Sequence, residues 1–141
     1  MKNLLLIMFA AFFPFNINAQ RMIDSIKVEK ISKVYCTNDT IKLSLNNSSS
    51  ENVKVTISLE GYLKKKIVWW IPDILGYMRG FGAFSKSVVF IPLSSSVNEV
   101  ISIPVNSKIF KRKITYRLIY NITSKSENDV LKKYSDYFRI M

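Results

Sequence analysis

Residues 114–122, ITYRLIYNI, carry an apolar side chain at every second position, with polar residues between several of them. Residues 53–59, VKVTISL, and residues 41–45, IKLSL, alternate in the same way. Successive side chains of a β-strand point to opposite faces of its sheet. Each stretch is therefore expected to form a strand with one face on a core and the other in solvent.

Further short stretches rich in valine, isoleucine and aromatic residues are also expected to be strands: 26–28, 87–92, 100–105 and 134–140. Polar clusters rich in asparagine, serine and aspartate separate the strands and are typical of turns. About seven short strands divided by such turns predict a sandwich or barrel. One polar face on each strand favours antiparallel pairing.

The order of these strands resembles an immunoglobulin-like β-sandwich. Residues 40–46 and 53–60 look like a consecutive pair over a polar turn, residues 116–118 look like the start of the penultimate strand, and residues 134–140 resemble the final strand. The resemblance implies that the Tyr116 hydroxyl binds an upstream backbone group. We therefore expect an all-β, antiparallel, immunoglobulin-like sandwich. The resemblance implies no function, because this fold supports many.

Residues 1–19 have the layout of a cleaved signal peptide. Lys2 gives a positive start, residues 4–15 form an almost unbroken apolar run, and the small residue Ala19 precedes the expected cleavage site. The run is shorter than the roughly 20 residues of a membrane-spanning helix. The sequence therefore predicts an exported protein, periplasmic or secreted, whose mature domain is residues 20–141 and has no transmembrane segment.

The composition is strongly basic, with 21 lysine and arginine residues against 10 acidic ones. Such an exported protein is attracted to anionic surfaces. The expected partner is an unknown envelope protein or an anionic glycan or lipid surface, and the leader argues against nucleic acid. The alternative is that a diffuse lysine excess reflects an AT-rich genome and solubility.

Residues 61–86 interrupt the alternation and hold all four glycines and both tryptophans. A strand at 66–71 and one or two helical turns at 72–78 are expected here, followed by a flexible link at 80–83. Long irregular connections in compact domains are often functional. The predicted contact surface consists of three aromatic residues and a basic rim: Trp69, Trp70, Tyr77, Lys64, Lys65, Lys66 and Arg79. The segment is interpreted as a hydrophobic cap on the sandwich, a platform for a partner or glycan, or a membrane-surface anchor.

The residues needed for common catalytic chemistry are missing. There is no histidine, Cys36 is the only cysteine, and the ten acids are scattered along the chain. These absences remove histidine-based nucleophilic sites and thiolate metal sites, so no cofactor or metal is expected. The sequence favours a non-enzymatic binding or accessory module. A protease inhibitor presenting a loop and a hydrolase built on carboxylates gathered by the fold remain alternatives.

Three single residues carry smaller predictions. Cys36 is expected to be a partly buried structural thiol, with an intermolecular disulfide or a reactive thiol as alternatives. Ser25 and Thr40 each lie between an aspartate and an isoleucine. This tripeptide resembles the sequon that some bacteria use for O-glycosylation of exported proteins, which makes Ser25 and Thr40 candidate modification sites.

Overall fold

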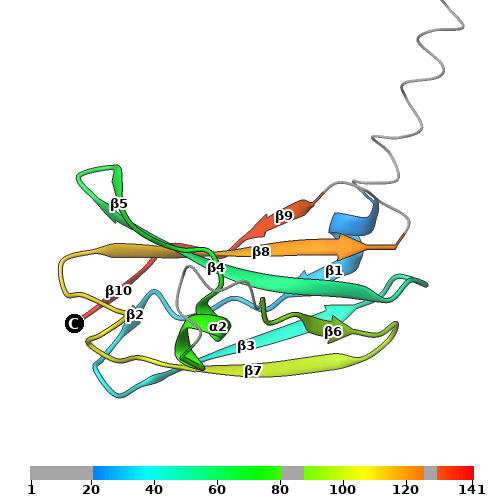
Figure 1. Ribbon diagram of the computed structural model, residues 1–141, viewed down its shortest axis with the longest axis horizontal. Helices are drawn as coiled ribbons and strands as arrows, with labels where there is room; N and C mark the ends of the chain where they lie inside the picture. Colours follow the sequence, from blue (N-terminus) through cyan, green and yellow to red (C-terminus); the bar gives the residue numbers. More distant parts are fainter. Residues whose placement is uncertain (1–20, 81–87, 126–129) are drawn as a thin grey trace, which may run out of the picture.

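The computed structural model describes residues 21–80, 88–125 and 130–141. The predicted signal peptide lies outside these residues. The described chain is mainly β and folds as a sandwich of two sheets (Figure 1). The smaller sheet has the order β1 (Ile26–Val28), β3 (Thr40–Asn47), β7 (Asn98–Pro104). The larger sheet has the order β2 (Val34–Tyr35), β10 (Phe138–Ile140), β8 (Thr115–Ser124), β4 (Val53–Leu63), β5 (Lys66–Ile71).

Two long strands, β4 and β8, form the centre of the larger sheet. They pair antiparallel from Val53 opposite Ser124 to Tyr62 opposite Thr115. The outer edge of β4 is shared by β5 and by β6 (Ile91–Leu93), and the outer edge of β8 is shared by β10 and by β9 (Leu131–Tyr134). Among the described strands β10 and β2 are parallel and the other pairs are antiparallel, which modifies the wholly antiparallel prediction.

The core lies between the two sheets and is built from the apolar positions of the alternating stretches. β4 contributes Val53, Val55, Ile57 and Leu59; β8 contributes Leu118, Tyr120 and Ile122; and β3 contributes Ile41, Leu43 and Leu45. All ten side chains are buried. The polar residues between them therefore belong to the outer faces, as the alternation predicts. Thr56 and Ser58 on the outer face of β4 are nevertheless buried, so that part of the face is not in solvent as expected.

The Tyr116 hydroxyl makes the contact that the resemblance implied. It accepts a hydrogen bond from the Lys111 N–H at 2.5 Å and lies 3.3 Å from the Lys111 carbonyl, to which it donates. The ring of Tyr116 packs edge-on against Phe110, with the ring centroids 5.2 Å apart. These contacts fix the connection that leads into β8.

Some strand boundaries differ from the prediction. The expected strand at 87–92 is the short β6, β2 was not expected, and the expected strand at 134–140 is divided into β9 and β10. The division has a local cause at Ser135, whose hydroxyl accepts the N–H of Leu118 at 2.9 Å. A side chain thus replaces a backbone partner, and the regular ladder stops there. The structure has ten strands among the described residues, against the seven expected.

Residues 61–80, the described part of the segment 61–86, are more regular than their composition indicated. β4 continues through Gly61 to Leu63, and β5 covers the strand expected at 66–71. The short helix α2 (Ile74–Met78) begins after Asp73, whose carboxylate accepts the N–H of Gly76. The link expected at 80–83 falls outside the described residues except for Gly80.

Candidate functional site

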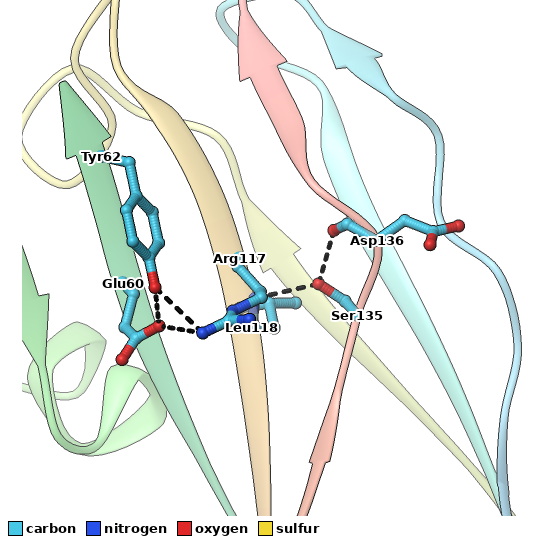
Figure 2. Close-up of polar contacts among 6 residues, drawn as sticks. All are labelled: Glu60, Tyr62, Arg117, Leu118, Ser135 and Asp136. Atoms are coloured by element: carbon cyan, nitrogen blue, oxygen red, sulfur yellow. Dashed lines mark hydrogen bonds and ion pairs between the residues drawn. The ribbon is translucent and has the colours of Figure 1, made fainter. Parts of the chain in front are cut away.

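The outer face of the larger sheet carries a closed network of three polar side chains. Glu60 on β4 is opposite Arg117 on β8, and the Arg117 Nη2 donates to the Glu60 Oε2 at 2.8 Å. The same Nη2 donates to the Tyr62 hydroxyl oxygen at 2.9 Å, and the Tyr62 hydroxyl donates to Glu60 (Figure 2). Residues 60 and 62 share a face because side chains two apart on a strand point the same way.

Three tyrosine rings surround the guanidinium group. The Arg117 Cζ lies 4.4 Å from the ring centroid of Tyr134, 5.3 Å from that of Tyr137 and 5.6 Å from that of Tyr62. The rings of Tyr62 and Tyr137 also meet edge to face at 5.6 Å. A cation within about 6 Å of an aromatic face is attracted by the ring quadrupole. We name these residues, Glu60, Tyr62, Arg117, Tyr134 and Tyr137, the arginine–tyrosine cluster.

The cluster is fixed in the middle and exposed at its margin. The side chains of Arg117 and Glu60 are mostly covered, at 24% and 13% exposure. Tyr134 and Tyr137 are each about half exposed. Trp70 on β5 pairs with Glu60 in register and is 61% exposed, so it extends the aromatic surface to the edge of the sheet. Tyrosine, tryptophan and arginine are the residues that contribute most to protein interfaces.

The electrostatics hold each member of the network in one protonation state. Burial alone raises the pKa of Glu60. Hydrogen bonds from Tyr62 and Arg117, together with the positive charges of Arg117 and Lys132, outweigh burial and lower this pKa. Burial and the bond to Glu60 raise the pKa of Tyr62 to about 12. Burial lowers the pKa of Arg117, but the contact with Glu60 outweighs it and the net direction is upward. At neutral pH the site is a carboxylate, a phenol and a guanidinium.

The aromatic residues predicted from the sequence do not lie on one surface. Trp70 is exposed, whereas Trp69 is partly buried against the core beside Gly61. Tyr77 on α2 is also partly buried against the core. The two tryptophans separate because adjacent residues of a strand face opposite sides. The sequence interpretation expected a strand at 66–71 but placed both tryptophans on one contact surface, and so did not apply the alternation of that strand to them.

The predicted basic rim is divided between two elements. Lys64, Lys65 and Lys66 are exposed at the turn between β4 and β5. Arg79 is exposed at the end of α2 and lines a pocket with Leu75 and Met78. The lysines therefore form a local basic group, and Arg79 belongs to a different part of the surface.

Sequence reasoning missed all five members of the cluster as site residues: Glu60, Tyr62, Arg117, Tyr134 and Tyr137. Glu60 and Arg117 carry opposite charges at polar positions of two predicted strands, which was a usable signal. Their pairing depends on the register of β4 against β8, and Tyr134 and Tyr137 depend on the path of the chain after β8. Neither could be derived from the alternation alone.

The small candidates have the following surroundings. Cys36 is exposed, so the expected partial burial is wrong; it lies in a turn after β2, where the Cys36 N–H donates to the Asp39 carboxylate at 2.6 Å. The Ser25 hydroxyl donates to the Met22 carbonyl at 2.7 Å, and Thr40 is exposed at the start of β3. O-glycosylation at Ser25 and Thr40 remains a prediction.

Two pockets of about 380 and 300 Å³ flank Met78, next to β7. The larger includes Val89, Ile101 and Glu99, and the smaller includes Tyr77 and Lys108. Within the described part of the chain, no three histidine, cysteine or acidic side chains gather in a way that would hold a metal ion. The same part contains no helix with the length and apolar character required to cross a membrane.

Comparisons with known proteins give only distant structural similarity. The chain matches no protein-family model and no curated protein sequence. A Niemann-Pick type C2 protein from Japanese carpenter ant is 15% identical with a TM-score of 0.41, over 82% of this chain and 95% of that one. A β-glucuronidase from glycoside hydrolase family 2 is 15% identical with a TM-score of 0.34, over 82% of this chain and 11% of that one. A β-glucosidase from Listeria innocua is 11% identical with a TM-score of 0.31, over 81% of this chain and 16% of that one. These TM-scores are too low to carry an inference.

Proposed function

We propose that this chain is an exported, immunoglobulin-like binding module without catalytic activity. Export rests on the signal-peptide pattern of residues 1–19. The fold assignment is supported by the order β1-β3-β7 in one sheet and β10-β8-β4 in the other, which corresponds to the A-B-E and G-F-C orders of immunoglobulin domains. The Tyr116 contact with Lys111 supports the same assignment.

The binding surface in this proposal is the outer face of the larger sheet, and its ligand is a protein. The observation that carries the proposal is the arginine–tyrosine cluster with Trp70 beside it. Glu60 balances the charge of Arg117, so the guanidinium positions the tyrosine rings without needing a ligand charge. Rigid, half-exposed aromatic side chains lose little conformational entropy on binding, which makes them effective interface anchors.

The protonation states support binding over catalysis. A general acid or base works best when its pKa is close to the working pH. The pKa of Glu60 is moved downward and that of Tyr62 is raised to about 12, so both shifts lead away from neutrality. Glu60 or Tyr62 acting as a general acid or base near neutral pH would require the opposite shifts.

The experiment is an affinity capture from the native envelope with the wild-type protein and matched variants. Trp70→Ala combined with Tyr134→Ala removes two exposed rings of the surface. Val100→Ala is the control, because Val100 is 63% exposed on β7 in the smaller sheet. Captured proteins are identified by mass spectrometry, and the affinity of each is then measured with purified components.

We expect the double variant to weaken a specific partner by about thirtyfold or more, the effect of losing one interface hot spot. The control should bind as the wild type does. Circular dichroism and thermal unfolding establish that both variants are folded. Equal binding by the wild type and the double variant would contradict the proposed surface, and hydrolytic turnover lost on Glu60→Gln would contradict the absence of catalysis.

A further inference from the structure

The turn between β4 and β5 has an unfavourable sequence for its backbone conformation. Leu63 pairs with Lys66, so the loop consists of Lys64 and Lys65 alone. Their φ angles are +48° and +66°. Two-residue hairpin loops with positive φ at both positions strongly prefer Asn-Gly or similar residues. Side chains with a Cβ are strained in this left-handed region. Turn stability therefore does not explain the two lysines.

The lysines are accompanied by exposed aliphatic side chains. Leu63, Ile67 and Val68 are between 45% and 56% exposed. The β4–β5 hairpin stands out from the body of the sandwich, so both faces of its end are accessible (Figure 1). Between Glu60 and Asp73 the sequence contains no acidic residue. We name residues 63–68 the lysine tip.

We propose that the lysine tip docks on an anionic lipid bilayer, with Lys64, Lys65 and Lys66 at the lipid phosphates and Leu63, Ile67 and Val68 in the interfacial layer. Each lysine near an anionic leaflet is attracted to it, and adjacent apolar side chains add binding by burial. This contact goes beyond the proposed function, because it uses different residues from the arginine–tyrosine cluster.

A bilayer fits this tip better than an acidic protein does. A specific protein interface covers about 800 Å² on each partner. A protruding two-residue turn with three aliphatic neighbours offers only a narrow contact. A fluid lipid surface accommodates a narrow tip without shape complementarity. The three lysines of the tip complement the negative charge of the lipids, because no acidic residue between Glu60 and Asp73 offsets them.

The test measures binding of the purified full chain to two kinds of vesicle, phosphatidylcholine mixed with phosphatidylglycerol and phosphatidylcholine alone. The triple variant K64Q/K65Q/K66Q removes the charges of the tip. The matched control K27Q/K30Q/K42Q removes three exposed charges carried by and next to β1 and β3. Every protein compared carries the same residues 1–20, so any contribution of that segment is common to all.

We expect the wild type to prefer the anionic vesicles and the tip variant to bind them roughly one hundredfold more weakly. The control should lose much less. L63S/I67S should also weaken binding, by about tenfold or more, without changing the charge. Equal losses in the two lysine variants, or binding that shows no preference for anionic vesicles, would overturn the proposal. So would retention by an acidic protein through the tip in the absence of vesicle binding.

A second variant separates function from folding. K64N/K65G supplies the residues that the turn prefers, so thermal unfolding should shift upward. Vesicle binding should nevertheless fall roughly thirtyfold through the loss of two charges. A more stable protein that binds vesicles as the wild type does would refute the lipid contact. Tyr134→Ala should leave vesicle binding unchanged, which distinguishes this inference from the protein-binding surface.

Discussion

Tyr62 shows how single residues of the outer face are held in one chemical state. Its hydroxyl donates to Glu60 and accepts from Arg117, so it uses both its donor and its acceptor capacity within the cluster. Ionisation of the phenol would remove the donor and place a second negative charge beside Glu60. Burial and the bond to Glu60 therefore raise the pKa of Tyr62 from 10.0 to about 12.

This shift predicts a dependence of stability on alkaline pH. Between pH 10 and pH 12 the unfolded chain releases the Tyr62 proton and the folded protein retains it. The free energy of unfolding then decreases as pH rises, while below pH 10 the contribution is fully present. Urea unfolding of the wild type and of Tyr62→Phe over this range checks the prediction. The variant should show a shallower decline, since its other tyrosines are unchanged; parallel curves would contradict the assignment.

Gly61 is a residue whose role depends on close approach. An added Cβ would lie 2.8 Å from the Trp69 Cβ and 2.9 Å from the Ile114 Cγ2. The register of β4 against β5 also shifts between Gly61 and Tyr62. The absence of a side chain at Gly61 thus allows Trp69 of the paired strand β5 to pack inward beside it, while Trp70 is exposed. The glycine was visible in the sequence, but the neighbour that requires it was not.

At the scale of elements, Asp73 connects the start of α2 to the chain just before β6. One carboxylate oxygen accepts the N–H of Gly76 at 3.0 Å and the other accepts the N–H of Val89 at 2.7 Å. The side chain is buried, so water does not replace these bonds easily. Asp73 therefore begins the helix and also holds the chain that returns to β6.

Replacement of Asp73 should consequently cost more than loss of an ordinary helix cap. Asp73→Ala is expected to lower the free energy of unfolding by about 2–4 kcal/mol, combining a lost cap with an unsatisfied N–H at Val89. Asp73→Asn should lose roughly half as much, because the amide retains one acceptor oxygen. Denaturant unfolding of both variants provides the measurement. A loss no larger than about 1 kcal/mol for alanine would mean that the bond to Val89 contributes nothing.

Elements that depend on local pattern could be predicted, and those that depend on non-local partners could not. The alternation at 53–59 and 114–122 placed β4 and β8. The Pro72–Asp73 pair predicted α2 but began it two residues early, because Asp73 is the N-cap and the helix starts at Ile74. The division of β9 from β10 depends on the Ser135 contact with Leu118, which lies 17 residues away. No periodicity encodes such a contact.

At the scale of the whole molecule, the two-sheet β-sandwich was predictable because most of its core comes from period-2 stretches. The candidate site was less predictable from the sequence. It needs the register that sets Glu60 against Arg117 and the chain path that brings Tyr134 and Tyr137 over the same guanidinium. Trp70 was the one predicted aromatic residue that the structure leaves mainly exposed. Composition located the unusual segment but did not reveal which of its side chains face outward.

Cleavage of the predicted signal peptide determines the residue at which the mature domain begins. Met22 is buried in the core, and the Lys133 Nζ donates to the Ile26 carbonyl at 2.6 Å. All the residues in these contacts lie beyond Ala19, so cleavage there leaves the contacts intact and should not destabilise the sandwich. The exported protein should therefore begin at Gln20. Intact-mass spectrometry of the exported protein checks this. Ala19→Arg should block processing, because signal peptidase requires a small residue there. An exported protein that retains residues 1–19, or one that begins beyond Met22, would contradict the predicted boundary.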